Sequence, residues 1–280
     1  MFVFHQGVLW MIIATIFFAL MGTFVKLGGG NFTPTELVFY RSSISLVIII
    51  AIMRWSNVSY SSNYIKLHLI RSLIGFISLL FFFYAINHLP LSTAISLNYT
   101  SPLFLGLLMP LILKRKVKKW LFLAVIIGFV GVFFILKPTF ENQNHFAGLI
   151  GLVSGLGAAM AYLFVTQLGQ LKEPVLRTIF YFTLISTICS ACIMLFDEIH
   201  NIQFEHILNL LGLGVSATIA QIAITKAYHV GNTLGNAGLS YLTIIFATII
   251  GVILFDELID WQTALGILLI IISGIFASKK

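Results

Sequence analysis

The chain has 280 residues, of which 59% are hydrophobic and 9% are charged. A soluble domain carries roughly a quarter charged residues, so this composition excludes a water-soluble fold and indicates an integral membrane protein. The net charge of +7 would also suit a nucleic-acid partner, but the basic residues stand in short segments beside apolar runs. That placement is typical of membrane topology, and we expect no nucleic-acid binding.

Apolar runs of about 20 residues predict ten transmembrane helices, because a helix of that length spans the hydrocarbon core of a bilayer. Glycine, proline or charged residues separate most runs; residues 28–31 stand before Pro34, and residues 231–232 divide the eighth run from the ninth. The first run has no charged leader, so we expect a permanent span rather than a cleaved signal. The predicted helices are approximately 7–27, 34–53, 67–87, 92–113, 119–136, 146–167, 175–196, 206–229, 233–254 and 261–277.

The basic residues predict that both termini face the cytoplasm, since cytoplasmic loops are enriched in lysine and arginine. With the N-terminus inside, the outside segments hold only Lys137 and, at a boundary, Lys26. We therefore expect a multi-pass protein of the cell membrane, specifically a bacterial inner membrane. The basic residues of the inside segments are Arg54, Lys66, Lys114, Arg115, Lys116, Lys118, Lys119, Lys172, Lys279 and Lys280.

Two segments about 142 residues apart resemble each other and end in opposite charges. Residues 85–99 precede an apolar run that stops at a basic cluster, residues 114–119, whereas residues 227–241 precede one that stops at acidic residues 256–260. A duplicated unit with an odd number of spans must sit upside down relative to its copy, which leaves one connecting loop basic and its counterpart free of bases. The pattern predicts an all-α membrane protein of two inverted five-helix repeats, an architecture of carriers. The predicted repeats are residues 1–138 and 139–280.

Three motifs of the first half are similar to those of the EamA family of the drug/metabolite transporter superfamily. They are Phe39-Tyr40-Arg41, Leu69-Ile70-Arg71-Ser72 and Leu89-Pro90-Leu91-Ser92-Thr93-Ala94. The resemblance covers almost the whole chain and implies a ten-span transporter. Members of the family move amino acids, nucleosides, S-adenosylmethionine, flavins, sugars or amino-acid-derived metallophores. The two arginines resemble those of the branch that includes S-adenosylmethionine carriers, whereas no arginine near residue 212 matches Arg71, so the two halves are expected to be functionally unequal.

Two arginines within predicted helices are candidate substrate-binding residues. Arg41 lies about seven residues into its helix, roughly 10 Å below the membrane surface. A charged side chain there costs about 2.5–3.5 kcal/mol on insertion scales, so it should face a partner or a water-filled cavity. The competing interpretation is a structural pair with Glu36, five residues earlier. Arg71 starts closer to the cytoplasmic surface, where extension to lipid headgroups is the alternative to a functional role.

The matching tyrosines Tyr99 and Tyr241 are predicted to line the two sides of one cavity near mid-depth. Neighbouring amides, Asn98 and Asn236, offer donors and acceptors for a polar solute, and the rings can stack on a flat or cationic one. Pro102 within the fourth predicted helix frees a backbone carbonyl, as in helices that line cavities. Plain packing is the alternative. The remaining members of the predicted translocation site are Tyr162 and Gln221.

The other motifs predict architecture and no further chemistry. Cys189 and Cys192 form a C-x-x-C spacing inside an apolar run without a second ligand pair, so we expect packing residues. The histidines show no paired-ligand spacing, and we predict no metal site and no cofactor. Glycines at four-residue spacing, such as Gly151 and Gly155, predict close helix contacts.

The predicted function is a secondary active transporter that moves a small polar metabolite by alternating access. The solute would be an amino acid, an amino-acid derivative or an S-adenosylmethionine-like compound, with a proton or a counter-solute as coupling partner. We expect no enzymatic activity and a monomer or homodimer. Two other hypotheses stay open: a membrane-embedded enzyme or flippase for a lipid-linked substrate, and a scaffold subunit.

Overall fold

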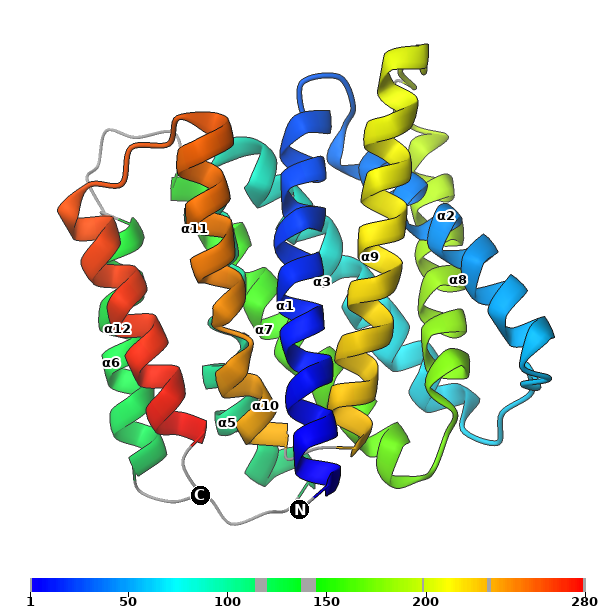
Figure 1. Cartoon of the computed structure of the whole chain (residues 1–280), viewed down its shortest axis with the longest axis horizontal. Helices are drawn as coiled ribbons and strands as arrows, with labels where there is room; N and C mark the ends of the chain where they lie inside the picture. Colours follow the sequence, from blue (N-terminus) through cyan, green and yellow to red (C-terminus); the bar gives the residue numbers. More distant parts are fainter. Residues whose placement is uncertain (1, 114–119, 137–144, 198, 231–232, 279–280) are drawn as a thin grey trace.

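The computed structural model describes residues 2–113, 120–136, 145–197, 199–230 and 233–278, and its described segments are helices joined by turns, without a strand (Figure 1). The basic cluster at 114–119, Lys137 and the predicted break at 231–232 lie outside this description. The helices are α1 (Phe2–Gly28), α2 (Pro34–Trp55), α3 (Ile65–His88), α4 (Leu91–Asn98), α5 (Ser101–Leu113), α6 (Trp120–Leu136), α7 (His145–Gln170), α8 (Val175–Met194), α9 (Phe204–Val230), α10 (Thr233–Leu239), α11 (Leu242–Phe255) and α12 (Trp261–Ser278).

Seven segments of the described chain are long and apolar enough to cross a membrane. Large apolar side chains are also exposed on the outside of the bundle, including Ile126 (62% exposed), Phe133 (62%) and Ile253 (71%). Such a surface suits lipid, and helices satisfy their own backbone hydrogen bonds there. The all-helical chain is therefore a multi-pass membrane protein. The seven segments are Gly7–Gly28, Pro34–Trp55, Ile65–His88, His145–Gln170, Val175–Met194, Phe204–His229 and Asn236–Phe255.

Two of the predicted continuous helices are interrupted, and this part of the prediction is wrong. The run 92–113 divides into α4 and α5 at residues 99–100, and the run 233–254 divides into α10 and α11 at residues 240–241. Pro102 accounts for the first break, because its ring excludes the α-helical hydrogen bond to the carbonyl of Asn98. At the second break the Ser240 hydroxyl donates to the carbonyl of Ala237 (2.6 Å), in competition with helix continuation.

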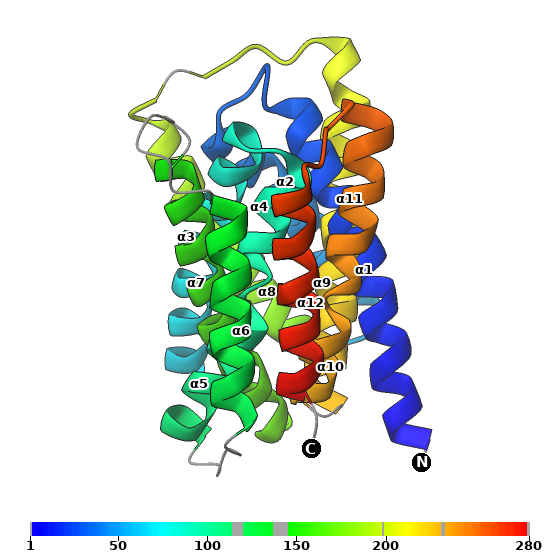
Figure 2. The same ribbon diagram turned by 90° about the vertical axis from the view of Figure 1, so that its left-hand side faces the viewer.

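The helices pack in pairs that join distant parts of the chain. α1 lies against α9, α2 against α8, α3 against α7, and α6 against α12; Figures 1 and 2 both show α12 beside α6. Glycine permits the last contact: a Cβ added to Gly131 would lie 2.7 Å from the carbonyl oxygen of Gly266, and one added to Gly266 would lie 2.6 Å from that of Gly131. The predicted role of glycine in close helix packing is confirmed at this pair.

Candidate functional site

A cavity of about 60 Å³ lies inside the bundle, bounded by side chains from α1, α2, α3, α7, α8 and α9 and by the end of α4. Apolar and polar side chains both contribute to its lining. The lining residues are Phe18, Met21, Arg41, Arg71, Gly75, Ser78, Leu79, Phe82, Asn98, Tyr99, Ala158, Ala161, Tyr162, Phe182 and Gln221. A cavity of this volume holds a few water molecules.

The two predicted arginines meet across one aromatic ring in this cavity. Arg41 on α2 is 1% exposed and Arg71 on α3 is 2% exposed. The guanidinium carbon of Arg71 lies 3.9 Å from the centroid of the Phe182 ring on α8, and that of Arg41 lies 5.1 Å from it. Arg41 also donates from Nη2 to Oε1 of Gln221 (3.4 Å). The Nε and Nη1 atoms of both arginines have no hydrogen-bond partner among the described residues.

No carboxylate of the described residues compensates these two charges. The alternative that Arg41 pairs with Glu36 is wrong, because Glu36 accepts hydrogen bonds from the backbone nitrogens of Thr33 and His200 (both 2.7 Å) and from Nδ1 of His200 (2.9 Å). None of the lining residues is acidic. A buried charge without a partner costs several kcal/mol, so packing alone does not account for two of them in one cavity.

Neutral polar side chains also line the cavity. Tyr162 on α7 stacks on Tyr228 of α9, with ring centroids 5.0 Å apart and an interplanar angle of 19°, which fixes its ring beside the cavity. Asn98 is the last residue of α4 and donates from Nδ2 to the hydroxyl of Ser154 (2.9 Å). Tyr99 follows within the break between α4 and α5. The last residue of α4 and the first residue after it therefore both line the cavity.

The structure brings together six of the eight residues of the predicted translocation site. These are Arg41, Arg71, Asn98, Tyr99, Tyr162 and Gln221, which all line the cavity.

Asn236 and Tyr241 are not among the lining residues. Asn236 donates from Nδ2 to the backbone carbonyl of Ala227 (2.5 Å) and so joins α10 to α9. Tyr241 shares a buried apolar cluster with Tyr99 and lies next to the lining, and its hydroxyl has no hydrogen-bond partner among the described residues. The exact correspondence expected between Tyr99 and Tyr241 is therefore absent from this cavity.

Sequence reasoning did not select Phe182, although it contacts both arginines. The chain has 26 phenylalanines, and no neighbouring motif distinguishes this one. Its importance follows only from the packing of α8 against α2 and α3.

Glu257 connects α1, α4 and the segment after α11 at one end of the bundle. Its Oε1 accepts from the backbone nitrogen of Leu91 (2.5 Å) and lies 3.1 Å from Nζ of Lys26. Its Oε2 accepts from the hydroxyl of Ser92 (3.2 Å), and Lys26 donates to the carbonyl of Leu89 (2.7 Å). A carboxylate at the start of α4 also stabilises the helix dipole. We call these contacts the Glu257 cluster.

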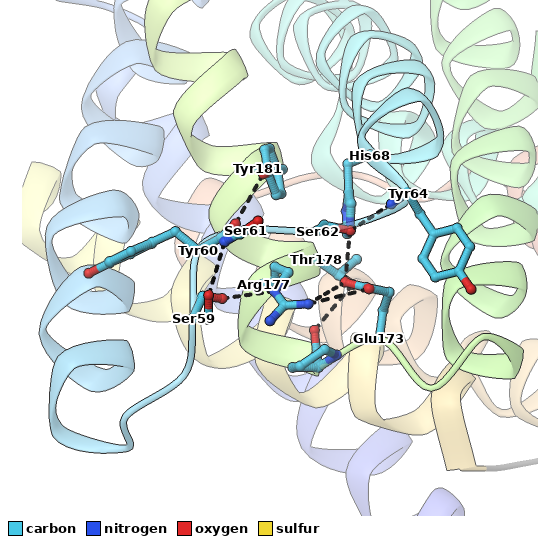
Figure 3. Close-up of polar contacts among 11 residues, drawn as sticks. Ser59, Tyr60, Ser61, Ser62, Tyr64, His68, Glu173, Arg177, Thr178 and Tyr181 are labelled. Carbon is cyan, nitrogen blue, oxygen red and sulfur yellow. Dashed lines mark hydrogen bonds and ion pairs between the residues drawn. The ribbon is translucent and has the colours of Figure 1, made fainter.

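A second polar cluster lies at the opposite end, between the α2–α3 loop and the α7–α8 turn (Figure 3). Glu173 accepts from Nε2 of His68 (3.2 Å) and from Nη1 of Arg177 (3.1 Å), while Nε of Arg177 donates to the carbonyl of Ser59 (2.8 Å). Burial alone would raise the pKa of Glu173, but the hydrogen bonds from His68 and Arg177 hold that pKa below its ordinary value. We call these contacts the Glu173 cluster.

The described residues hold no group of three or more histidines, cysteines and acids that could bind a metal ion. Cys189 and Cys192 are free thiols, half-buried and exposed respectively, on α8.

The chain is similar to transporters over nearly its full length. The EamA-like transporter family matches residues 5–137 and again residues 145–278. An uncharacterized transporter of Helicobacter pylori is 30% identical over 277 residues, covering 96% of this chain and 93% of the relative. The pseudopaline exporter CntI of Pseudomonas aeruginosa is 29% identical, covering 98% and 96%. The S-adenosylmethionine uptake transporter of Rickettsia prowazekii is 23% identical, covering 97% and 92%.

Proposed function

Because the chain belongs to the EamA-like transporter family and hence takes part in membrane transport of a small metabolite, we propose that it acts as a secondary transporter that works by alternating access. The solute would bind in the central cavity, which would open to one side of the cell membrane at a time. The observation that carries this proposal is the pair of buried arginines without a protein counter-charge in that cavity.

Two inverted five-helix halves, residues 1–138 and 139–280, are part of the proposal. The family matches the chain twice, once in each of these segments. Each segment also contains one interrupted helix at a corresponding position, with the breaks at residues 99–100 and 240–241. Figure 2 shows α4 above α5 but α10 below α11, so the two interrupted pairs run in opposite directions. If each interrupted pair is one span, the twelve helices make ten spans, and interrupted spans at matching positions are typical of carrier binding sites.

We propose that the translocation path is lined by Arg41, Arg71, Asn98, Tyr99, Tyr162 and Gln221. The present cavity has a volume of about 60 Å³, so it must widen before a metabolite larger than a few waters can occupy it. The Glu257 cluster and the Glu173 cluster close opposite ends of the bundle, and each would have to open in one half of the cycle. Asn236 and Tyr241 would join the path only in another arrangement; the unpaired hydroxyl of Tyr241 supports such a rearrangement.

The charges around the cavity favour exchange or facilitated movement over tight proton coupling. A proton relay within a membrane needs a titratable group beside the solute, usually an acid or a histidine. The lining residues include neither. An enzyme or flippase would need reactive acids at the membrane face, and of the acids at 256–260 Glu257 is held in an ion pair with Lys26. The relatives' names also indicate a transporter and not an enzyme.

Transport by purified protein in liposomes tests the proposal. Uptake of radiolabelled amino acids, nucleosides and carboxylic acids is measured for the wild type, for R41A and for R54A. We expect protein-dependent uptake of at least one solute, lost in R41A and retained in R54A, whose arginine is exposed at the end of α2. Size-exclusion chromatography is used to check that R41A is folded. Equal uptake by R41A and the wild type, or uptake of no solute in this range, would contradict the proposal.

A further inference from the structure

We infer that the transported solute is an organic anion: a carboxylate joined to an apolar or aromatic body, with net negative charge. This inference rests on the proposed function, since it assigns the substrate class of the same cavity.

The first observation is the number of unused donors. Nε and Nη1 of Arg41 and the same two atoms of Arg71 are buried and without a hydrogen-bond partner. A guanidinium presents its N–H groups in a planar fork that matches the two oxygens of a carboxylate. Arginine stays protonated in proteins, so these donors remain available at every physiological pH.

The second observation is that the cavity contains two cations and no anion. Its lining includes Arg41 and Arg71 but neither Asp nor Glu. The other buried acids of the described helices and turns are engaged elsewhere: Glu36 with His200, Glu173 with Arg177, and Glu257 with Lys26. A solute with a carboxylate would therefore supply the missing counter-charge.

The same arrangement disfavours solutes with net positive charge. An ammonium or sulfonium group would find no carboxylate in the cavity and would lie near two like charges, which selects against it. The face of Phe182 is one that a cation could use, but both guanidiniums already lie over this ring. An S-adenosylmethionine-like cation is thus a poor fit to this chain, although a more distant relative is named for that substrate.

The rest of the lining defines the body of the solute. Phe18, Met21, Leu79 and Phe82 supply apolar side chains, and Tyr162 is also among the lining residues. Pockets of this type bury the apolar part of a ligand and use a few polar groups for orientation. A carboxylate with an aromatic or branched aliphatic body matches both the two arginines and the apolar lining residues.

Pairs of probes with the same shape and different charge test the inference on the detergent-purified full-length protein. Phenylacetate is compared with phenylacetamide, and succinate with succinamide; phenylalaninamide serves as the cation. Affinity is measured by the ligand-dependent rise in melting temperature in a chloride-free buffer. We expect at least one carboxylate to bind on the order of 10- to 100-fold more tightly than its amide, as charge-assisted hydrogen bonds predict. The variants R41Q and R71Q should each reduce this preference, R71K should retain more of it than R71Q, and R54Q should leave it unchanged.

Three results would overturn the inference: amides that bind as tightly as their carboxylates, tighter binding of phenylalaninamide, or stabilisation by chloride alone with no organic anion effective. The wild-type comparisons decide the matter even if a variant fails to fold. Uptake into liposomes distinguishes a failure of the proposed function from a failure of the anion inference. Carboxylates that bind but are not transported would contradict the proposed function alone, whereas transport of neutral or cationic solutes without binding of carboxylates would contradict only the anion inference.

Discussion

Replacing Glu257 with glutamine should shift the protein toward a state that is open at the end of the bundle where the Glu257 cluster lies. The carboxylate is 8% exposed and makes contacts of 2.5 Å with the Leu91 nitrogen, 3.2 Å with the Ser92 hydroxyl and 3.1 Å with Lys26. Glutamine keeps one accepting oxygen but loses the charge and the second acceptor. A hydrogen bond to a charged group stabilises by about 1.5–3 kcal/mol, so a net loss of about 2 kcal/mol is expected.

A loss of that size multiplies the population of the open state about 30-fold, provided that the closed state predominates in the wild type and that opening breaks these contacts. The assay uses a reporter cysteine, S78C, at a buried residue that lines the cavity, in a background with C189S and C192S. A membrane-impermeant thiol reagent is added from the Glu257 side, and the labelling rate is followed. We expect E257Q to raise this rate by about 10- to 30-fold.

The control for charge removal is E205Q, because the side chain of Glu205 is 74% exposed and its carboxylate lies 3.6 Å from Nε2 of the neighbouring His206. Its labelling rate should equal that of the parent. If E257Q and E205Q label S78C equally fast, while both react fully after denaturation, the Glu257 cluster does not hold the bundle closed and the reasoning fails.

Three further predictions concern packing and pH. G155A should lower stability by about 1–3 kcal/mol and slow transport, because its Cβ would meet carbonyl oxygens at the end of α4 at 2.9 Å, whereas G30A, with open space around it, should be neutral in both assays. G131A and G266A should each destabilise the protein, because either methyl group pushes α6 and α12 apart. Once one methyl group has separated the helices the second costs less, so the double variant should lose about 1 kcal/mol less free energy of unfolding in detergent than the sum of the single variants. Strict additivity would refute this prediction. The lowered pKa of Glu173 means that its stabilising effect is present above its ordinary pKa of 4.5 and is lost as the pH falls through the lowered value. The melting temperatures of the wild type and E173Q should therefore differ at pH 7 and converge as the pH falls below that ordinary value; a constant difference would contradict the assignment.

Most of the helices and most of the candidate site were predictable from residues whose placement has a large energetic consequence. An apolar run of about 20 residues has few alternatives to a membrane helix. Arg41 and Arg71 were recognisable because a charge within such a run requires a cavity or a partner. Gln221, the partner of Arg41 at 3.4 Å, was recognisable because a neutral amide within an apolar run also needs a hydrogen-bond partner.

The missed features depend on small local preferences or on packing between distant helices. The break between α10 and α11 has no proline and rests on hydrogen bonds such as that of Ser240, which compete only weakly with a helix. Strict analogy with Tyr99 predicts Tyr241 at the cavity, but Tyr99 is the first residue of its break whereas Tyr241 is the second residue of the other, so the two positions do not match exactly. The pairing of Arg41 with Glu36 was equally plausible until the loop before α9 brought His200 to that carboxylate.

The sharing of Phe182 by two cations has a mechanical consequence. The ring belongs to α8, whose first turn carries Arg177 of the Glu173 cluster, whereas the cations belong to α2 and α3. A solute that pulls either guanidinium away from the ring therefore also changes the surroundings of the other. We expect α8 to transmit this change from the cavity, where Phe182 lies, to the Glu173 cluster at the start of the helix.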